Sequence, residues 1–128
     1  GRGAVVNVAS IAAFAPFPTQ AAYGASKAFV LSLSEALWAE TRGTGVHVMA
    51  LCPGATDTGF FRTLGHRMNV SKTSPEAVAA VAVDALDRGA MTVVPGFVDR
   101  LRCCLAVRLL PRRAIARLMR AVLESTYR

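Results

Sequence analysis

Short β-branched runs alternate along this chain with longer stretches in which apolar residues recur every three or four positions. The short runs, each predicting a buried strand, cover residues 4–8, 46–52 and 91–94. The longer stretches, each predicting a helix, cover about 21–41 and 75–87. Strands that alternate with helices in this way indicate parallel βαβ units and an α/β layer architecture.

The boundaries of these elements carry recognisable signals. Ser74-Pro75-Glu76 places a capping serine, a proline and an acid at the start of the second helix. Pro16 and Pro18 predict a loop over residues 11–20. Residues 56–72 have mixed polarity and little periodicity, so we interpret them as a long loop of the kind that is usually functional or mobile.

The chain after Gly96 has a different character. Pro111 divides it into two helical patterns, and the second carries an apolar stripe made of Ile115, Leu118, Met119, Val122 and Leu123. We therefore divide the chain into residues 1–96, one α/β domain, and residues 97–128, a basic amphipathic helical tail. Such a helix either lies on an anionic membrane surface or packs on protein, against its own body or a second subunit; we favour packing.

Composition supports the α/β interpretation and narrows the function. A hydrophobic fraction of 53% suits a parallel sheet that is covered by helices on both faces. The net charge of +7 does not predict nucleic-acid binding, because eight of the fifteen basic residues are arginines within 100–128 and none of the charge is interleaved with aromatic residues. We expect no nucleic-acid partner.

The cysteines bear on whether the protein binds a metal, and the hydropathy bears on where in the cell it is found. Cys52 falls in a predicted strand, and Cys103 and Cys104 are adjacent, which is not a metal-ligand spacing. We therefore predict no metal site. The amino terminus lacks the regions of a signal peptide, and no apolar run reaches the ~18 residues of a spanning helix. A cytoplasmic protein is the expectation.

One short motif carries candidate chemistry. Tyr23-Gly-Ala-Ser-Lys27 places a phenol and an ammonium four residues apart at the start of a predicted helix, and therefore on one helical face. A free phenol has a pKa near 10, and a neighbouring ammonium lowers such a value toward the range of a general acid and base. The motif alone is weak, because the same spacing also describes an ordinary surface pair.

Two further motifs stand in register with this one. Ser10 lies thirteen residues before Tyr23, after the run Val5-Val6-Asn7-Val8-Ala9, and Leu51-Cys52-Pro53-Gly54 is followed by Thr58, five residues after the proline. Together the three motifs resemble the short-chain dehydrogenase/reductase family over about fifty residues. The resemblance implies a Rossmann-like fold and an NAD(P)-dependent oxidoreductase that interconverts a carbonyl and a secondary alcohol by hydride transfer.

The same resemblance implies a role for each site residue. Tyr23 would be the general acid and base, Ser10 would hold the substrate oxygen, and Lys27 would hydrogen-bond the nicotinamide ribose. Tyr23 would also contact the cofactor, as would a group of residues after the second strand: Pro53, Gly54, Ala55 and Thr58. Without the register, Ser10 would be interpreted as the cap of a turn or helix.

Parts of the family pattern do not occur in these residues. The glycine-rich turn after a first strand, the residue that distinguishes NAD from NADP, and an upstream asparagine have no counterpart here. We therefore expect a partial doubly wound parallel sheet that lacks its amino-terminal βαβ half, with an apolar unpaired edge at residues 4–8, poor stability and no activity in isolation. The cofactor is NAD or NADP.

Substrate and partners are less determined. We expect a small carbonyl or alcohol, of lipophilic character if Phe60 and Phe61 line its site, and a homo-oligomer when the fold is complete. Two other hypotheses stay open. The chain could be a non-catalytic remnant or binding module that keeps the motif by descent, or a peripheral membrane protein that uses its arginine-rich tail.

Overall fold

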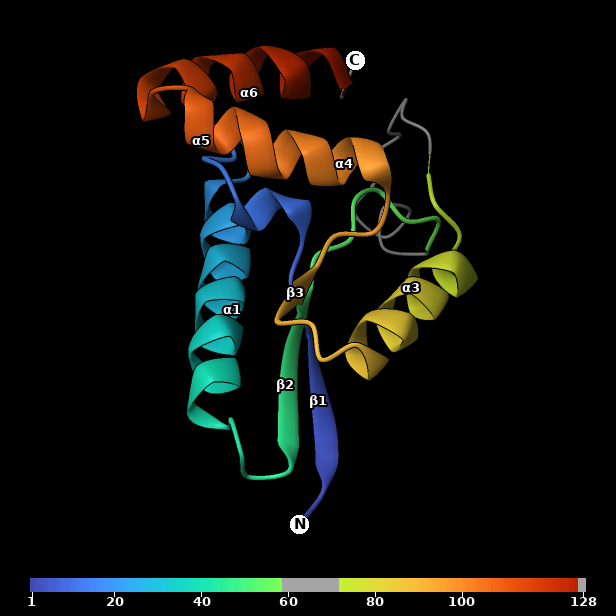
Figure 1. Ribbon diagram of the computed structural model, residues 1–128. Helices are drawn as coiled ribbons and strands as arrows, with labels where there is room; N and C mark the ends of the chain where they lie inside the picture. Colours follow the sequence, from blue (N-terminus) through green and yellow to red (C-terminus); the bar gives the residue numbers. More distant parts are fainter. Residues whose placement is uncertain (59–71, 127–128) are drawn as a thin grey trace.

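A computed structural model describes residues 1–58 and 72–126. Three strands form one sheet between two helices, and a helical tail lies across the end of the sheet where the strands finish (Figure 1). The sheet and its helices are β1 (Gly3–Val8), α1 (Ala21–Glu40), β2 (Val46–Leu51), α3 (Pro75–Asp87) and β3 (Thr92–Val93). The remaining elements are a 3₁₀ turn η1 (Ile11–Ala13), α4 (Phe97–Leu101), the π-helical η2 (Arg102–Ala106), α5 (Val107–Leu109) and α6 (Arg112–Thr126).

The sheet is parallel throughout and has β2 at its centre. Its strand order is β1-β2-β3, with Gly3 opposite Val46 at one end of the first pair and Val8 opposite Leu51 at the other. β3 is shorter than the predicted run 91–94 and pairs with β2 through Thr92 and Val93 only. The α/β class and the parallel sheet predicted from the alternating pattern are confirmed.

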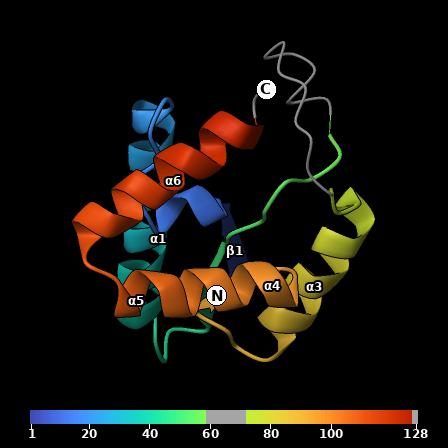
Figure 2. The ribbon, with the colours of Figure 1, turned by 90° about the horizontal axis from the view of Figure 1, so that it is seen from above.

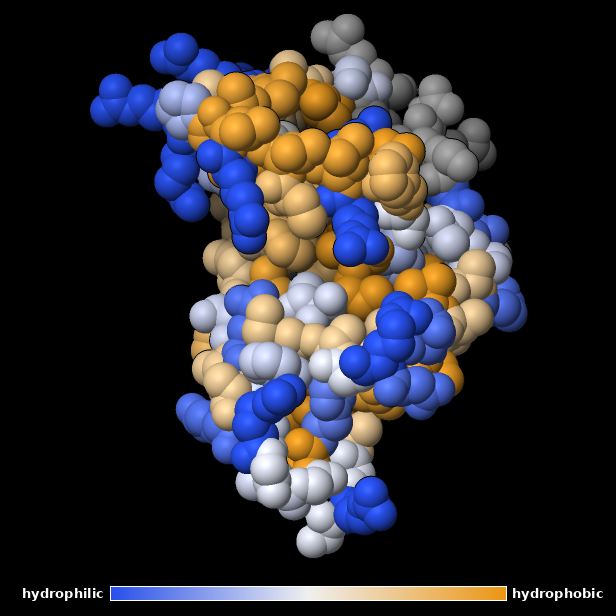
Figure 3. Space-filling view, in the orientation of Figure 1, coloured by the Kyte–Doolittle hydropathy of each residue, from blue (hydrophilic) through white to orange (hydrophobic). Residues whose placement is uncertain are grey.

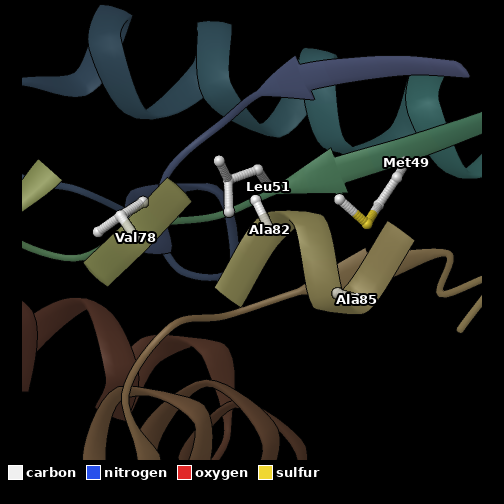
Figure 4. Close-up of a cluster of buried hydrophobic side chains, with 5 residues drawn as sticks. All are labelled: Met49, Leu51, Val78, Ala82 and Ala85. Atoms are coloured by element: carbon white, nitrogen blue, oxygen red, sulfur yellow. The ribbon is translucent and has the colours of Figure 1, made fainter. Parts of the chain in front are cut away.

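The core lies on both faces of β2, because successive side chains of a strand point to opposite faces. Met49 and Leu51 point toward α3, where they pack against Val78, Ala82 and Ala85 (Figure 4). On the other face, Ala50 and the adjoining Cys52 pack with Ala9 and Leu31, the latter from α1. β2 is therefore the strand that joins the two apolar layers.

The sequence predicted that β1 is a buried strand, but the structure places it at the surface. Its valines are exposed, with Val5 at 47%, Val6 at 37% and Val8 at 54% of their full accessible areas. The strand is long enough and paired along its whole length, but it lies at one edge of the three-stranded sheet, and the helices pack mainly on β2. The apolar unpaired edge expected at residues 4–8 is therefore present in the described structure.

The helix boundaries follow their sequence signals closely. The Ser74 side chain accepts a hydrogen bond from the backbone N–H of Ala77 at 3.2 Å and caps α3. Past the end of α1, Gly43 and Gly45 adopt φ values of 81° and 84°, which side chains rarely tolerate. The predicted loop at 11–20 contains the 3₁₀ turn η1, and most of the predicted loop 56–72, with Phe60 and Phe61, lies outside the described residues.

The helices of the tail are interrupted at Pro111, where the sequence predicted a division, and the chain turns back there (Figure 2). Seen from above, the helical segment from α4 to α5 runs along one side and α6 crosses the molecule separately (Figure 2). Ile115 and Leu123 of α6 are 4% and 5% exposed, so this helix packs part of its stripe on protein. Over residues 1–58 and 72–126, no helix combines the length and the apolarity that crossing a bilayer requires.

Candidate active site

All but one of the predicted site residues line one pocket at the carboxyl ends of β1 and β2. This is the end of a parallel sheet at which ligands usually bind. The pocket has a volume of about 400 Å³, and its lining includes the following predicted residues: Ser10, Tyr23, Lys27, Pro53, Gly54 and Thr58. Segments that are far apart in the sequence thus contribute to one concave surface.

Lys27 joins the start of α1 to the end of β1. Its Nζ donates a hydrogen bond to the carbonyl oxygen of Val8 at 3.0 Å, and the same ammonium lies 5.7 Å from the centroid of the Tyr23 ring. The four-residue spacing of the motif therefore places both groups on one face of α1, as helix geometry requires. The carbonyl of Val8 fixes the ammonium beside the phenol.

Tyr23 is positioned by the loop that precedes α1. Its ring lies 6.2 Å from the ring of Phe17, centroid to centroid, with the planes tilted by 55°. Gly24 makes this contact sterically feasible, because a Cβ at that position would lie 2.6 Å from the Cβ of Phe17. Sequence reasoning missed both supporting residues, although a glycine within a helical pattern signals close approach of another segment.

Ser10 caps a turn and also lies at the pocket. It lies two residues after β1 and is 9% exposed, and its Oγ accepts a hydrogen bond from the N–H of Ala12 at 3.2 Å, which caps η1. It also lines the pocket together with Tyr23. The capping bond uses the oxygen as an acceptor, so the hydroxyl hydrogen remains for a ligand on the pocket side.

The segment after β2 forms the facing wall. Pro53, Gly54 and Thr58 line the pocket, and Thr56, which sequence reasoning missed, lines it as well. Ala55 is not among the lining residues; its carbonyl oxygen instead accepts a hydrogen bond from the N–H of Thr73 at 2.9 Å. Ala55 therefore contributes a backbone hydrogen bond to this segment and no surface to the pocket.

Gly54 is in contact with the tail. A Cβ built on it would collide with the Oδ2 of Asp99, a residue of α4. A bare backbone at this position therefore lets the carboxylate of the tail approach the pocket wall. Unlike the contact of Gly24 with Phe17, this one involves the end of a flexible side chain, which could move aside for a larger residue.

A third wall comes from the start of α3. Pro75, Val78 and Ala79 line the pocket and add apolar surface to it, in contrast to the polar side chains of Ser10, Tyr23 and Lys27. The sequence identified Pro75 only as a helix start. Its place at the pocket follows from the connection between β2 and β3, which carries the amino-terminal turn of α3 to the same end of the sheet.

The cysteines beside this site are poor nucleophiles. Burial raises the pKa of the Cys52 thiol to about 12, with a smaller contribution from Cys103. Burial likewise raises the pKa of Cys103 to about 11, and Asp99 adds to the effect. In the described portion of the chain, no three histidine, cysteine or acidic side chains are grouped so that they could hold a metal ion.

Known proteins resemble this chain in both sequence and fold. The family model described as short chain dehydrogenase matches residues 1–69. One relative is 2-(S)-hydroxypropyl-CoM dehydrogenase 3 of Xanthobacter autotrophicus, 40% identical over 79 residues, which are 61% of this chain and 29% of that protein.

Two solved structures cover more of the chain. A short-chain dehydrogenase from Sphingobium yanoikuyae in complex with NADPH has a TM-score of 0.70 and 28% identity, over 95% of this chain and 45% of its own. A short chain dehydrogenase from Burkholderia cenocepacia in complex with NADP has a TM-score of 0.75 and 28% identity, over 92% and 47%. This chain thus spans less than half of each of these proteins, and it belongs to the short-chain dehydrogenase/reductase family.

Proposed function

We propose that this chain carries the catalytic residues of an NAD(P)-dependent oxidoreductase that reduces a carbonyl or oxidises a secondary alcohol. The observation that carries the proposal is the convergence of Ser10, Tyr23 and Lys27 on one pocket, with the Lys27 ammonium held beside the Tyr23 ring. These side chains come from the segment after β1 and from α1. A surface Tyr–Lys pair would need neither the pocket nor the bond from Lys27 to Val8.

The residues fit the nicotinamide end of the cofactor. Lys27 offers ammonium hydrogens and Thr58 a hydroxyl at the pocket, and Gly54 exposes its backbone there. When bound, the nicotinamide would supply or accept the hydride. The relatives in complex with NADP and NADPH support a nicotinamide cofactor, and we leave NAD and NADP as alternatives because the discriminating residue has no counterpart in this sequence.

Tyr23 and Ser10 would handle the proton and the developing charge. As a carbonyl oxygen gains negative charge, the phenol of Tyr23 would donate its proton to that oxygen, and the Ser10 hydroxyl would donate a hydrogen bond to it. In alcohol oxidation the same proton would return to the Tyr23 oxygen. The ammonium of Lys27, 5.7 Å from the centroid of the Tyr23 ring, would lie near the negative charge that remains on this side chain after donation.

The walls of the pocket support a small substrate with apolar substituents. Pro75, Val78 and Ala79 offer no hydrogen-bonding side chain, whereas the polar groups lie on the side of Ser10 and Tyr23. A carbonyl that approaches Tyr23 would therefore direct its hydrocarbon part toward α3. This arrangement supports the lipophilic substrate that the sequence suggested.

The complete enzyme would be a cytoplasmic homo-oligomer. On α1, Phe29 is 65% exposed and Leu33 is 42% exposed, which supports an apolar contact with a second copy. All three cysteines are free thiols, which is typical of a reducing compartment. We further propose that residues 1–128 alone are inactive, because they contain no glycine-rich turn for the pyrophosphate.

The first test is the DNA upstream of the codon for Gly1. A continuous reading frame that encodes a strand, a glycine-rich turn and a helix would support the enzyme. An immediate in-frame stop would refute enzyme activity for this chain and favour a non-catalytic remnant. Isothermal titration of residues 1–128 with NADPH and NADH is expected to show no measurable heat of binding.

The second test is Tyr23→Phe in the protein encoded by the complete frame. We expect kcat/KM for carbonyl reduction to fall by about 10²- to 10⁴-fold, the usual contribution of a general acid, while cofactor binding is retained. Tyr127→Phe, at the only other tyrosine, is the matched control. Unchanged turnover in Tyr23→Phe would refute the assignment.

A parallel pair of variants tests the lysine. Lys27→Met is expected to weaken cofactor binding and turnover together, because the ammonium serves both the ribose and the phenol. Lys72→Met provides the control, since Lys72 is the only other lysine and pairs with Asp57 on the surface at 3.6 Å. Equal effects of the two variants would show that loss of positive charge, rather than position, is responsible.

A further inference from the structure

The tail presents an apolar stripe to solvent along α4, η2 and α5. Its members recur every four residues: Phe97 is 79% exposed, Leu101 46%, Leu105 47% and Leu109 74%. Residues four positions apart are neighbours on a helical surface, so each of these side chains adjoins the next and the four form a row. In Figure 3 the hydrophobic side chains form an orange band over α4, α5 and α6, with blue hydrophilic side chains at its margins.

Arginines border this stripe on both sides. Arg102 follows Leu101 on one neighbouring row of the helical surface, and Arg100 and Arg108 lie on the opposite one. All three are exposed. In the described part of the chain, Arg102 pairs with Asp99 at 3.7 Å, whereas no salt bridge within 4.0 Å involves Arg100 or Arg108.

The charge of the tail contrasts with that of the body. Residues 97–128 hold eight arginines against two acidic residues, a net charge of +6, whereas residues 1–96 hold seven basic and six acidic residues, a net charge of +1. A second copy of the tail would bring like charges together over the stripe. An anionic surface would instead neutralise them.

We propose that α4, η2 and α5 bind the surface of an anionic membrane. The row from Phe97 to Leu109 enters the interface between headgroups and acyl chains, and the bordering arginines reach the lipid phosphates. The binding is peripheral. It would keep the oxidoreductase beside substrates that dissolve in the bilayer, although the lipid contact itself does not depend on the proposed reaction.

Flotation with lipid vesicles tests the proposal on the 128-residue chain. We expect the chain to float with vesicles of phosphatidylcholine and phosphatidylserine, and to stay at the bottom with phosphatidylcholine alone. Aggregates from the exposed β1 edge also stay at the bottom, so flotation separates them from bound protein. High salt should release the chain, because screening shortens the range of the attraction from about 10 Å at 0.1 M to about 3 Å at 1 M.

Two pairs of matched variants separate the apolar and the charged contributions. Phe97→Asp with Leu109→Asp should abolish flotation, whereas Phe29→Asp with Val83→Asp, at helical positions that are 65% and 60% exposed, should leave it unchanged. Arg100→Gln with Arg108→Gln should weaken partitioning by about 30-fold at low salt, since each basic residue contributes about a fivefold factor. The control variant with Arg2→Gln and Arg88→Gln loses the same two positive charges, but outside the tail, and it should float like the wild type.

Circular dichroism of every variant checks that its helices are intact. If the variant that combines Phe97→Asp with Leu109→Asp has lost helical structure, the variant that combines Phe97→Ser with Leu109→Ser replaces it. Equal flotation with and without phosphatidylserine would overturn the proposal, as would unchanged flotation of the tail variants. A third outcome would also overturn the proposal. In it the chain does not float, size-exclusion chromatography shows a dimer, and Phe97→Asp with Leu109→Asp dissociates that dimer. The stripe would then be the contact with a second copy.

Discussion

β1 and β2 are neighbouring strands of six residues each, paired along their whole length, but their side chains lie in different environments. From Val48 to Leu51, every residue of β2 is buried, and Met49 and Ala50 are fully so. Val5, Val6 and Val8 of β1 are between 37% and 54% exposed. The two strands have the same length and share one ladder of backbone hydrogen bonds, but β2 lies at the centre of the sheet and β1 lies at its edge, so position within the sheet accounts for the difference.

The difference shows that the surroundings of a strand decide what an apolar side chain contributes. α3 covers one face of β2 and α1 covers the other, which gives the strand two apolar layers. β1 has a partner strand on one side only, and its one half-buried side chain is that of Asn7. A valine at an edge retains most of its contact with water and therefore stabilises the fold little.

The largest expected effect on stability comes from a substitution in the buried strand β2. Met49→Ala removes a fully buried side chain from between β2 and α3, which should lower the free energy of unfolding by about 2–5 kcal/mol. Urea denaturation followed by circular dichroism measures it. A loss below about 0.5 kcal/mol would mean that the layer between β2 and α3 is not well packed.

Thiol labelling compares the buried end of β2 with the exposed tail. Cys52 should react with a maleimide at pH 7 at least about a hundredfold more slowly than Cys104, because Cys52 is fully buried and burial raises its pKa to about 12, so that thiolate is scarce. Raising the pH toward 12 should speed the reaction of Cys52. Peptide mass spectrometry on a Cys103→Ser background assigns the sites. Similar rates at pH 7 would show that the strand end opens readily.

A smaller effect is expected at the side chain that connects β1 to α1. Asn7→Ala removes the hydrogen bond from its Nδ2 to the Oγ of buried Ser34 at 3.0 Å. Ser34 still donates to the carbonyl oxygen of Val30 at 2.6 Å, so it is not left without a partner. We expect a loss of about 1 kcal/mol in the same urea experiment. A loss as large as that of Met49→Ala would indicate that β1 is anchored mainly through this bond.

The smallest effect is expected on the exposed face of β1. Val6→Thr keeps the β-branched shape and should change the free energy of unfolding by no more than about 0.5 kcal/mol. A second variant of the same face, Val5→Lys, tests aggregation. Its charge should block edge-to-edge pairing, so aggregation followed by light scattering over time should be slower than in the wild type. A large destabilisation by Val6→Thr would show that another segment covers β1.

Much of the local structure was predictable from short-range signals. Ser74 caps α3 through a bond to the residue three positions later, and the glycines after α1 adopt positive φ, so both depend on nearby residues only. The helical spacing predicted that Tyr23 and Lys27 share one face, and the family resemblance implied that Ser10 joins them; all three line one pocket. Their catalytic roles stay a prediction until the variants are measured.

Other features depend on contacts between distant segments. The approach of Phe17 to Gly24, the contact of Asp99 with Gly54, and the apolar wall made by α3 join residues that no periodicity relates. The same holds for β1, whose β-branched pattern equally describes a buried strand and this exposed one. A β-branched pattern indicates that the side chains are stabilised by apolar surroundings, but it does not indicate whether the folded chain covers them.

The sequence by itself determined the order of strands and helices, the caps, and the spacing that places a phenol and an ammonium on one helical face, because these follow from the repeat of a helix and from local hydrogen bonds. Only the tertiary structure decided that the ammonium is held by the end of β1, that Ala55 does not line the pocket, and that the tail turns an arginine-bordered apolar row to solvent. Burial depends on which surfaces meet, and that is a property of the packed chain.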